Sequence, residues 1–182
     1  MHSPTHREET MVFGKKKQHI DNLNDLYSQQ LQEQYSVENE YLDLLADLNE
    51  TASLANLKEA LVEERRRTEQ HRETIERICR RRNLDPEGHS SKGMKALTKS
   101  VGDAIDVDGE PAVRDLVIMT LLRRVKQFEG SGFEMLRTYA DKLGFDEDAR
   151  DHQKMVEEEN VATAQLADVA DNKILKGLKT YD

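Results

Sequence analysis

The sequence has few of the residues that build disulfide-rich, β-sheet or membrane-spanning proteins. Its 182 positions include one cysteine, three prolines, no tryptophan and only 5% aromatic residues. The single cysteine, Cys79, excludes an intramolecular disulfide and indicates a reducing compartment. A run of about 18 apolar residues, which a membrane-spanning helix needs, is absent. The N-terminus is polar and lacks the apolar segment of a signal peptide. We therefore expect a cytoplasmic protein with no membrane partner.

Charge is what the sequence has in abundance. Charged residues make up 35% of the chain, and 36 acidic residues outnumber 27 lysines and arginines, giving a formal net charge of -9. The length suits one domain with a sizeable core. The composition favours long, solvated helices over a β-sandwich. The negative balance argues against a dedicated nucleic-acid binder.

Apolar residues recur at gaps of three and four along four long segments, which is the spacing of helices in a bundle. We predict four long helices and one short helix, over residues 20–48, 54–82, 92–105, 111–143 and 147–170. The short helix falls in the long connection between the second and third long helices, where it would link and cover them. The predicted fold is all-α: an antiparallel four-helix bundle with a short additional helix in the crossover connection.

The ends of these segments divide the chain into three parts. Residues 1–18 show no periodicity and are predicted to form a flexible tail. Residues 19–171 form the bundle, and a polar tail covers 172–182. Ser53 or Thr51 is expected to cap the second helix. Gly144 and Asp146 are expected to end the third long helix and to cap the fourth.

Each long helix places a glutamate near the middle of its apolar seam. The four seam carboxylates are Glu38, Glu64, Glu129 and Glu159. For any one helix, a small rotation that lets the side chain reach water is the simpler explanation. Four carboxylates at similar depth favour a shared polar centre, because buried carboxylates are costly unless they are paired or bind a metal. Bundles that hold two metal ions use one Glu from each of two helices and a Glu-x-x-His from each of the other two.

Four segments resemble the YciE/YciF family of ferritin-like bacterial stress proteins in their order and spacing. They are YSVE (35–38), LKEALVEERRRTEQHRETIERI (57–78), RRVKQFEGSGFEMLRTYADKLG (123–144) and VEEENVATAQL (156–166). The resemblance runs from residue 23 to residue 170. It implies a ferritin-like bundle, an association with stress responses, and a centre in which carboxylates and His or Gln can hold metal.

Position by position, the resemblance supplies an incomplete metal site. The candidate metal ligands that keep the family pattern are Glu38, His71, Glu129 and Glu159. Arg67 and Lys126 depart from it, because each stands where the family has a glutamate. Thr163 replaces an aspartate, and Glu64 replaces a histidine. A fixed cation removes a ligand and repels a metal ion. We therefore expect Arg67, Lys126 and Glu64 to form ion pairs inside the core.

Three functions follow from these features. The favoured one is a non-enzymatic, stress-associated bundle with a degraded di-metal site, carrying iron or manganese only if a residual site is occupied. The second is a di-iron or di-manganese oxidase or peroxide scavenger that uses the same ligands. The third is phosphate or nucleic-acid contact through the arginine-rich second helix, at EERRRTEQHR and CRRR. Pairing of these arginines with glutamates one turn away is the simpler reading of that stretch.

The third long helix has a wider apolar stripe than one bundle seam needs. Val117, Leu121, Phe128 and Met135 flank the edge that carries Glu129. Apolar surface beyond the needs of the core often marks an interface. The stripe predicts a homodimer or a higher homo-oligomer. His152, on the fourth seam, is expected to be a core histidine rather than a ligand.

Overall fold

The computed structural model describes residues 20–106 and 108–178, and this part of the chain contains helices and no β-strand. The predicted all-α fold is confirmed. The helices are α1 (Leu23–Thr51), α2 (Ala55–Arg81), α3 (Lys92–Ile105), α4 (Pro111–Leu143) and α5 (Asp146–Asp168). No helix of the described ranges is long and apolar enough to cross a membrane. The tail predicted over residues 1–18 lies outside the described residues.

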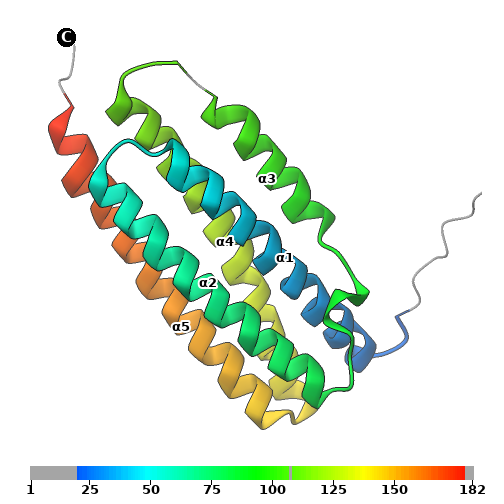
Figure 1. Ribbon diagram of the computed structural model, residues 1–182. Helices are drawn as coiled ribbons and strands as arrows, with labels where there is room; N and C mark the ends of the chain where they lie inside the picture. Colours follow the sequence, from blue (N-terminus) through cyan, green and yellow to red (C-terminus); the bar gives the residue numbers. More distant parts are fainter. Residues whose placement is uncertain (1–19, 107, 179–182) are drawn as a thin grey trace, which may run out of the picture.

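Helices α1, α2, α4 and α5 form an antiparallel bundle, and α3 lies outside it along α1 and α4 (Figure 1). Each bundle helix runs antiparallel to its two neighbours, so α2 and α4 lie on a diagonal and point the same way. The chain must therefore return along the outside of the bundle between α2 and α4. A short 3-10 turn (Pro86–Gly88) and α3 make this return. The predicted crossover helix is confirmed.

Two apolar clusters fill the ends of the bundle, and a polar layer separates them. Cluster members toward one end include Leu45, Leu48, Leu57, Leu122 and Val125. Members toward the other end include Tyr27, Leu31, Ile75, Phe133 and Leu136. All four seam glutamates are buried between the two clusters. The four helices therefore bring the predicted carboxylates to one layer near the middle of the bundle.

Sequence spacing predicts that α1 buries Tyr27, Leu31, Gln34, Glu38, Tyr41, Leu45 and Leu48, and all of them are buried. On α5 it predicts a buried seam of Ala149, His152, Val156, Glu159, Thr163 and Leu166, which is right only at alternate positions. His152, Glu159 and Leu166 are buried as expected. Between them, however, the buried residues are Met155 and Ala162, each one position before the predicted residue. Helix α5 is rich in Glu, Asp and Ala, so its sparse apolar residues fix the rotation of the helix less firmly than the leucines of α1 do.

The local sequence predicts the end of α4 correctly but not the cap at the start of α2. Gly144 adopts the left-handed conformation (φ 72°) and ends α4 as predicted. The expected cap of α2 by Ser53 or Thr51 is wrong. Instead the buried carboxylate of Asp115, on α4, accepts the backbone N–H groups of Ser53 at 2.9 Å and Leu54 at 2.7 Å. A cap that comes from another helix leaves no local sequence signal.

The bundle also extends further toward the C-terminus than predicted. After α5 the chain continues in a π-helical segment (Val169–Ile174) and a 3-10 turn (Leu175–Gly177). Ile174 is 1% exposed and joins the apolar cluster that contains Leu166. Ile174, three residues beyond the predicted boundary at residue 171, therefore belongs to the apolar core. Because most residues of this stretch are polar, the sequence did not indicate that Ile174 is buried.

Candidate functional site

Lys126 lies at the centre of the polar layer. Its side chain is 1% exposed, and its Nζ forms ion pairs with Glu64, with Glu129 at 2.9 Å and with Glu159. These three carboxylates come from α2, α4 and α5. Burial alone would lower the pKa of Lys126, but the surrounding carboxylates outweigh it and hold the pKa well above its usual range. The ammonium is therefore a charged, buried counterion shared by three glutamates.

Arg67 lies on the outer side of Glu64. Its Nη1 is 2.5 Å from Glu64 Oε2, and its Nη2 is 3.8 Å from Glu63 Oε1 and 3.4 Å from Gln165 Oε1. Glu64 thus accepts from both predicted core cations, since its other oxygen faces Lys126. The structure brings together Arg67, Glu64 and Lys126, the three residues expected to pair. Within the described part of the chain, Arg67 forms ion pairs with Glu63 and Glu64 and none with Glu38, Glu129 or Glu159.

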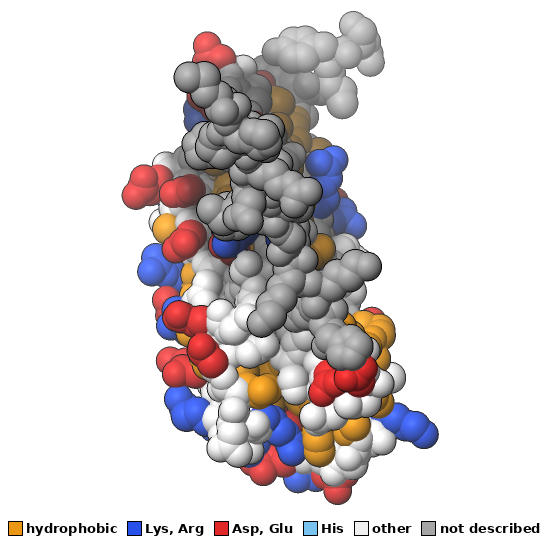
Figure 2. Space-filling view, turned by 90° about the vertical axis from the view of Figure 1, so that its right-hand side faces the viewer, with side chains coloured by type: hydrophobic (Ala, Val, Ile, Leu, Met, Phe, Trp, Pro, Cys, Tyr) orange, Lys and Arg blue, Asp and Glu red, His pale blue; other side chains and the backbone are white. Residues whose placement is uncertain are grey.

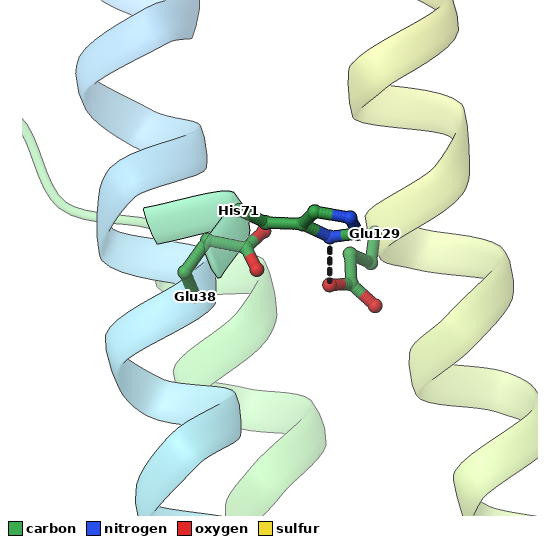
Figure 3. Close-up of side chains that lie close together, drawn as sticks. All are labelled: Glu38, His71 and Glu129. Atoms are coloured by element: carbon green, nitrogen blue, oxygen red, sulfur yellow. Dashed lines mark ion pairs between the residues drawn. The ribbon is translucent and has the colours of Figure 1, made fainter. Parts of the chain in front are cut away.

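A second group lies beside this network, with His71 reaching between Glu38 of α1 and Glu129 of α4 (Figure 3). One ligand atom from each of these three residues lies within 4.8 Å of the others. His71 Nδ1 is 4.0 Å from Glu129 Oε1 and 3.7 Å from Glu159 Oε1. The edge of the imidazole packs against Phe133, with ring centroids 5.2 Å apart. The four predicted metal ligands are therefore neighbours in a buried layer.

These residues leave buried polar atoms without a partner that satisfies hydrogen-bond distance and angle. The atoms are Glu38 Oε2, His71 Nδ1, Glu129 Oε1 and Glu159 Oε1. Unpaired polar atoms of this kind are rare in proteins and call for an ion, a water or a proton. Three carboxylate oxygens and one imidazole nitrogen are donors that suit iron or manganese. The donor set therefore fits a divalent cation.

The orientation of His71 supports the same reading. Its Nε2 is 3.0 Å from Glu158 Oε2. An ionised carboxylate only accepts hydrogen bonds, so Nε2 is the donor, and a neutral imidazole then presents the Nδ1 lone pair to the core. A carboxylate behind a histidine in this way is the usual outer support of a metal-binding imidazole. In the acidic run 157–159, the sequence spacing predicts that Glu159 points inward, and Glu159 is buried. The contact of Glu158 with His71 was not predicted.

The carboxylates of the layer differ in how they respond to burial. Burial alone would raise the pKa of Glu129, but the adjacent Lys126 ammonium brings it to about 2. Burial, and then the nearby Glu129 charge, raise the pKa of Glu38 well above its usual value. The same two causes raise the pKa of Glu159 to about 9, with Lys126 opposing them. When no further cation is present, the carboxyl groups of Glu38 and Glu159 therefore favour the protonated form more than an exposed glutamate does.

Gln34 and Gly132 form a contact that sequence analysis also missed. Gln34 Nε2 donates to Glu38 Oε1 at 3.0 Å and to the carbonyl oxygen of Glu129 at 3.3 Å. A Cβ atom on Gly132 would lie 2.0 Å from Gln34 Oε1, so the glycine makes room for this amide. The signal was present in the sequence, because Gln34 precedes Glu38 by four residues on the same seam. Gln34 thus fixes one oxygen of Glu38 and leaves the other facing His71 and Glu129.

Most arginines of the two arginine-rich stretches pair with carboxylates of this chain, and Arg72 contacts the amide oxygen of Asn39 at 3.5 Å. Arg65, Arg66 and Arg80 pair with glutamates three or four residues away at 2.6–3.2 Å. Arg81 Nη2 and Arg82 Nε contact Asp148 of α5 at 2.8 and 2.6 Å. On the face shown in Figure 2, the described surface mixes acidic and basic side chains with small apolar patches. These contacts match the simpler reading of the arginine-rich stretch and give no support to a phosphate site.

A separate buried cluster surrounds His152, near the C-terminal end of α2. Tyr27 Oη donates to Asp148 at 2.9 Å and lies 3.1 Å from His152 Nε2. Burial lowers the pKa of His152 to about 4, against the opposing charges of Asp148 and Asp151. Cys79 is also fully buried, and burial raises the pKa of its thiol to about 12. These groups hold helices together rather than face an open site.

Comparison with known proteins gives one similar sequence, two similar structures and one matching family. YciF of Escherichia coli is 24% identical over 155 residues, which are 85% of this chain and 93% of that protein. The crystal structure of the E. coli stress protein YciF superposes with a TM-score of 0.80, covering 84% of this chain and 97% of that one. YcfI of Rhodopseudomonas palustris superposes with a TM-score of 0.78 at 21% identity, covering 85% and 98%. The sequence profile of the family described as "Domain of unknown function (DUF892)" matches residues 22–179. The chain belongs to this family, and its resemblance to the YciE/YciF proteins is confirmed.

Proposed function

We propose that this protein is a non-enzymatic, stress-associated, ferritin-like bundle in which a lysine has taken one of two cation positions. The observation that supports the proposal is the Lys126 ammonium, buried among Glu64, Glu129 and Glu159 from three different helices. The association with stress rests on the similarity to YciF, which is described as a stress protein.

The Lys126 position argues against two-ion chemistry. Glu64, Glu129 and Glu159 form a buried acidic group, within the described residues, whose ligand atoms are close enough to share a cation. Lys126 Nζ is within ion-pair distance of all three. A metal ion there would meet a positive charge at contact distance in a layer that screens charge poorly. An oxidase that shares its carboxylates between two ions is therefore the less favoured function.

The second position keeps a donor set for one divalent ion. Glu38, His71, Glu129 and Glu159 would hold iron or manganese there, and a bound ion would add a fixed double charge to the core. The charge balance suits one ion. The layer has four carboxylates, and the fixed cations Lys126 and Arg67 leave two negative charges, which one divalent ion cancels. Without the ion, burial raises the pKa of Glu38 and of Glu159, which favours proton uptake and so reduces the negative charge of the layer.

Metal stoichiometry tests the proposal. Metal-free wild-type protein titrated with Mn²⁺ or Fe²⁺ should bind one ion per chain, measured by calorimetry and by elemental analysis after gel filtration. The double variant Arg67→Glu with Lys126→Glu restores two carboxylates and should bind a second ion. Two ions per wild-type chain would contradict the replacement by Lys126. No binding at all would contradict the residual position.

A matched control separates the site from a general change in charge. Arg66 and Lys95 are exposed, with side chains 55% and 53% accessible. The double variant Arg66→Glu with Lys95→Glu changes the net charge by the same amount and leaves the core intact. It should bind one ion, as the wild type does.

A further inference from the structure

Surface pockets approach the polar layer between α2 and α5 and between α1 and α4. Three of them differ in the group that lies toward the core, and a further pocket, of about 400 Å³, has both Arg67 and Glu158 in its lining. A pocket of about 450 Å³ between α2 and α5 has Glu64 and Arg67 among its lining. A pocket of about 140 Å³ between α1 and α4 has Gln34 among its lining. The third, of about 280 Å³, lies further along the groove between α2 and α5, and His71 and Glu158 line it. The helices that form this groove stand side by side in Figure 1.

The innermost group of each pocket decides whether a cation can pass. In the first pocket a cation would meet the Arg67 guanidinium, which is 2.5 Å from Glu64 and repels positive charge. In the second it would meet the Gln34 amide, whose NH₂ group is directed at Glu38 and Glu129. In the third it would meet a carboxylate and an imidazole, both of which bind divalent ions. The first and third pockets have the same balance of charged side chains, so these inner groups make the difference.

The His71–Glu158 pair connects this third pocket with the core. The Glu158 side chain is 35% exposed, and its Oε2 is 3.0 Å from His71 Nε2. The His71 side chain is 2% exposed, and its other nitrogen, Nδ1, faces Glu129 and Glu159 at 4.0 and 3.7 Å. One imidazole thus has one nitrogen at the inner wall of the pocket and the other at the candidate cation position.

We infer that the pocket formed by His71 and Glu158 is the route by which a divalent cation reaches the buried layer, and that Glu158 is its first binding group. The inference rests on the proposed single-cation position. Glu158 attracts the hydrated ion and replaces part of its water, and the ion then passes His71 to Glu38, Glu129 and Glu159. Lys154 Nζ, 3.6 Å from Glu158 Oε1, pairs with the same carboxylate from the solvent side. The cation must displace this lysine to enter.

The test measures the rate of metal uptake, separately from affinity. Metal-free protein is mixed with Co²⁺ in a stopped-flow instrument, and the visible absorption of the bound ion reports binding. Glu158→Gln keeps the shape of the side chain and removes its charge. It should slow uptake roughly tenfold, the lower range for loss of electrostatic steering. The amide oxygen of the introduced glutamine can still accept from His71 Nε2, which keeps the outer support of the imidazole. Release should therefore slow as well, and the dissociation constant should change by less than the uptake rate does.

Glu157→Gln is the matched control. Glu157 is the neighbouring residue on α5, is exposed, and pairs with Gln153 rather than with His71. This variant should take up Co²⁺ at the wild-type rate. Equal rates in the two variants would overturn the route while leaving the cation position in place. A weaker affinity of Glu158→Gln with unchanged uptake would also overturn it, because Glu158 would then act on the bound ion, directly or through His71, and not on its entry. Absence of Co²⁺ binding by wild type would overturn both the route and the proposed position.

Discussion

Lys126 is the residue on which the polar layer depends. An ammonium in a protein core is stable only when several acceptors replace its water, and three glutamates do so here. The same contact stabilises the glutamates, which would otherwise face each other across the layer. The charge of Lys126 and the burial of the carboxylates therefore depend on each other.

Replacing Lys126 by methionine keeps the length of the side chain and removes the charge. We expect a loss of about 3–5 kcal/mol in the free energy of unfolding, as for other buried pairs that lose one partner. Urea unfolding near pH 7 measures it. Lys95→Met is the control, because Lys95 is 53% exposed and 3.7 Å from Glu40. It should cost less than about 1 kcal/mol. A loss this small for Lys126→Met would show that the glutamates do not need the ammonium.

His152 should make stability depend on pH. Its pKa is lowered from 6.5 to about 4 in the folded protein, so the unfolded chain takes up a proton first as the pH falls. The contribution is fully present above pH 6.5 and is lost as the pH drops toward 4, by up to about 3 kcal/mol. Urea unfolding of wild type and His152→Gln at several pH values tests this. The variant should show a shallower loss over this range, whereas His89→Gln, in the crossover connection, should follow the wild type.

At the scale of single elements, the start of α2 is stabilised by a residue of another helix, Asp115 of α4, and not by its own local sequence. Asp115→Ala removes the acceptor of two backbone N–H groups and should destabilise the protein by about 1–2 kcal/mol. Hydrogen exchange should quicken at Ser53 and Leu54. Ser53→Ala should have little effect, because the Ser53 side chain makes no capping bond. A larger loss of stability for Ser53→Ala than for Asp115→Ala would instead support the cap by Ser53 that the sequence predicts.

Two glycines of α4 test the contact with α1. A Cβ on Gly130 would meet nothing within 4 Å, so Gly130→Ala should stabilise the helix by about 0.5–1 kcal/mol. A Cβ on Gly132 would displace the amide of Gln34 and break its hydrogen bond to Glu38. Gly132→Ala should therefore be less stable than Gly130→Ala by about 1–3 kcal/mol in thermal or urea unfolding. Equal effects would mean that Gln34 is not held in this place.

The helices were predictable where leucines mark one face and less so where they do not. In α1 the spacing from Tyr27 to Leu48 fixed both the helix and its buried face. In α5 the acidic run 157–159 indicated an inward Glu159, but only the folded structure shows that Glu158 reaches His71. The position of Arg67 outside Glu64 was also hidden, because a long side chain can point either way along its helix. Contacts between helices, such as Asp115 with α2, depend on tertiary packing that periodicity does not contain.

At the scale of the whole molecule, α3 changes the basis for the predicted homo-oligomer. Val117 and Leu121 pack within the cluster that α3 helps to cover, so they are not free for a partner. Phe128 and Met135 remain 37% and 45% exposed beside a shallow pocket that includes Val37. The apolar strip on α4 is therefore shorter than the sequence suggested.

The homo-oligomer stays a prediction, now tied to this shorter strip. Light scattering at tens of micromolar should give at least twice the monomer mass, and Phe128→Lys with Met135→Lys should reduce it to the monomer. Val62→Lys with Val161→Lys is the control, since both valines are exposed on α2 and α5. A monomeric wild type would show that the exposed strip is not an interface between copies of the chain.

The ammonium of Lys126 is joined to the polypeptide, whereas a metal ion must be acquired from the surroundings. The position that Lys126 fills is complete as soon as the chain has folded, and chelation or scarcity of iron cannot empty it. In the proposed function, the other position would stay exchangeable, because its excess negative charge can be reduced by protons or by an ion. A bundle built in this way would keep its shape during metal starvation and would register the return of a divalent ion through a single site.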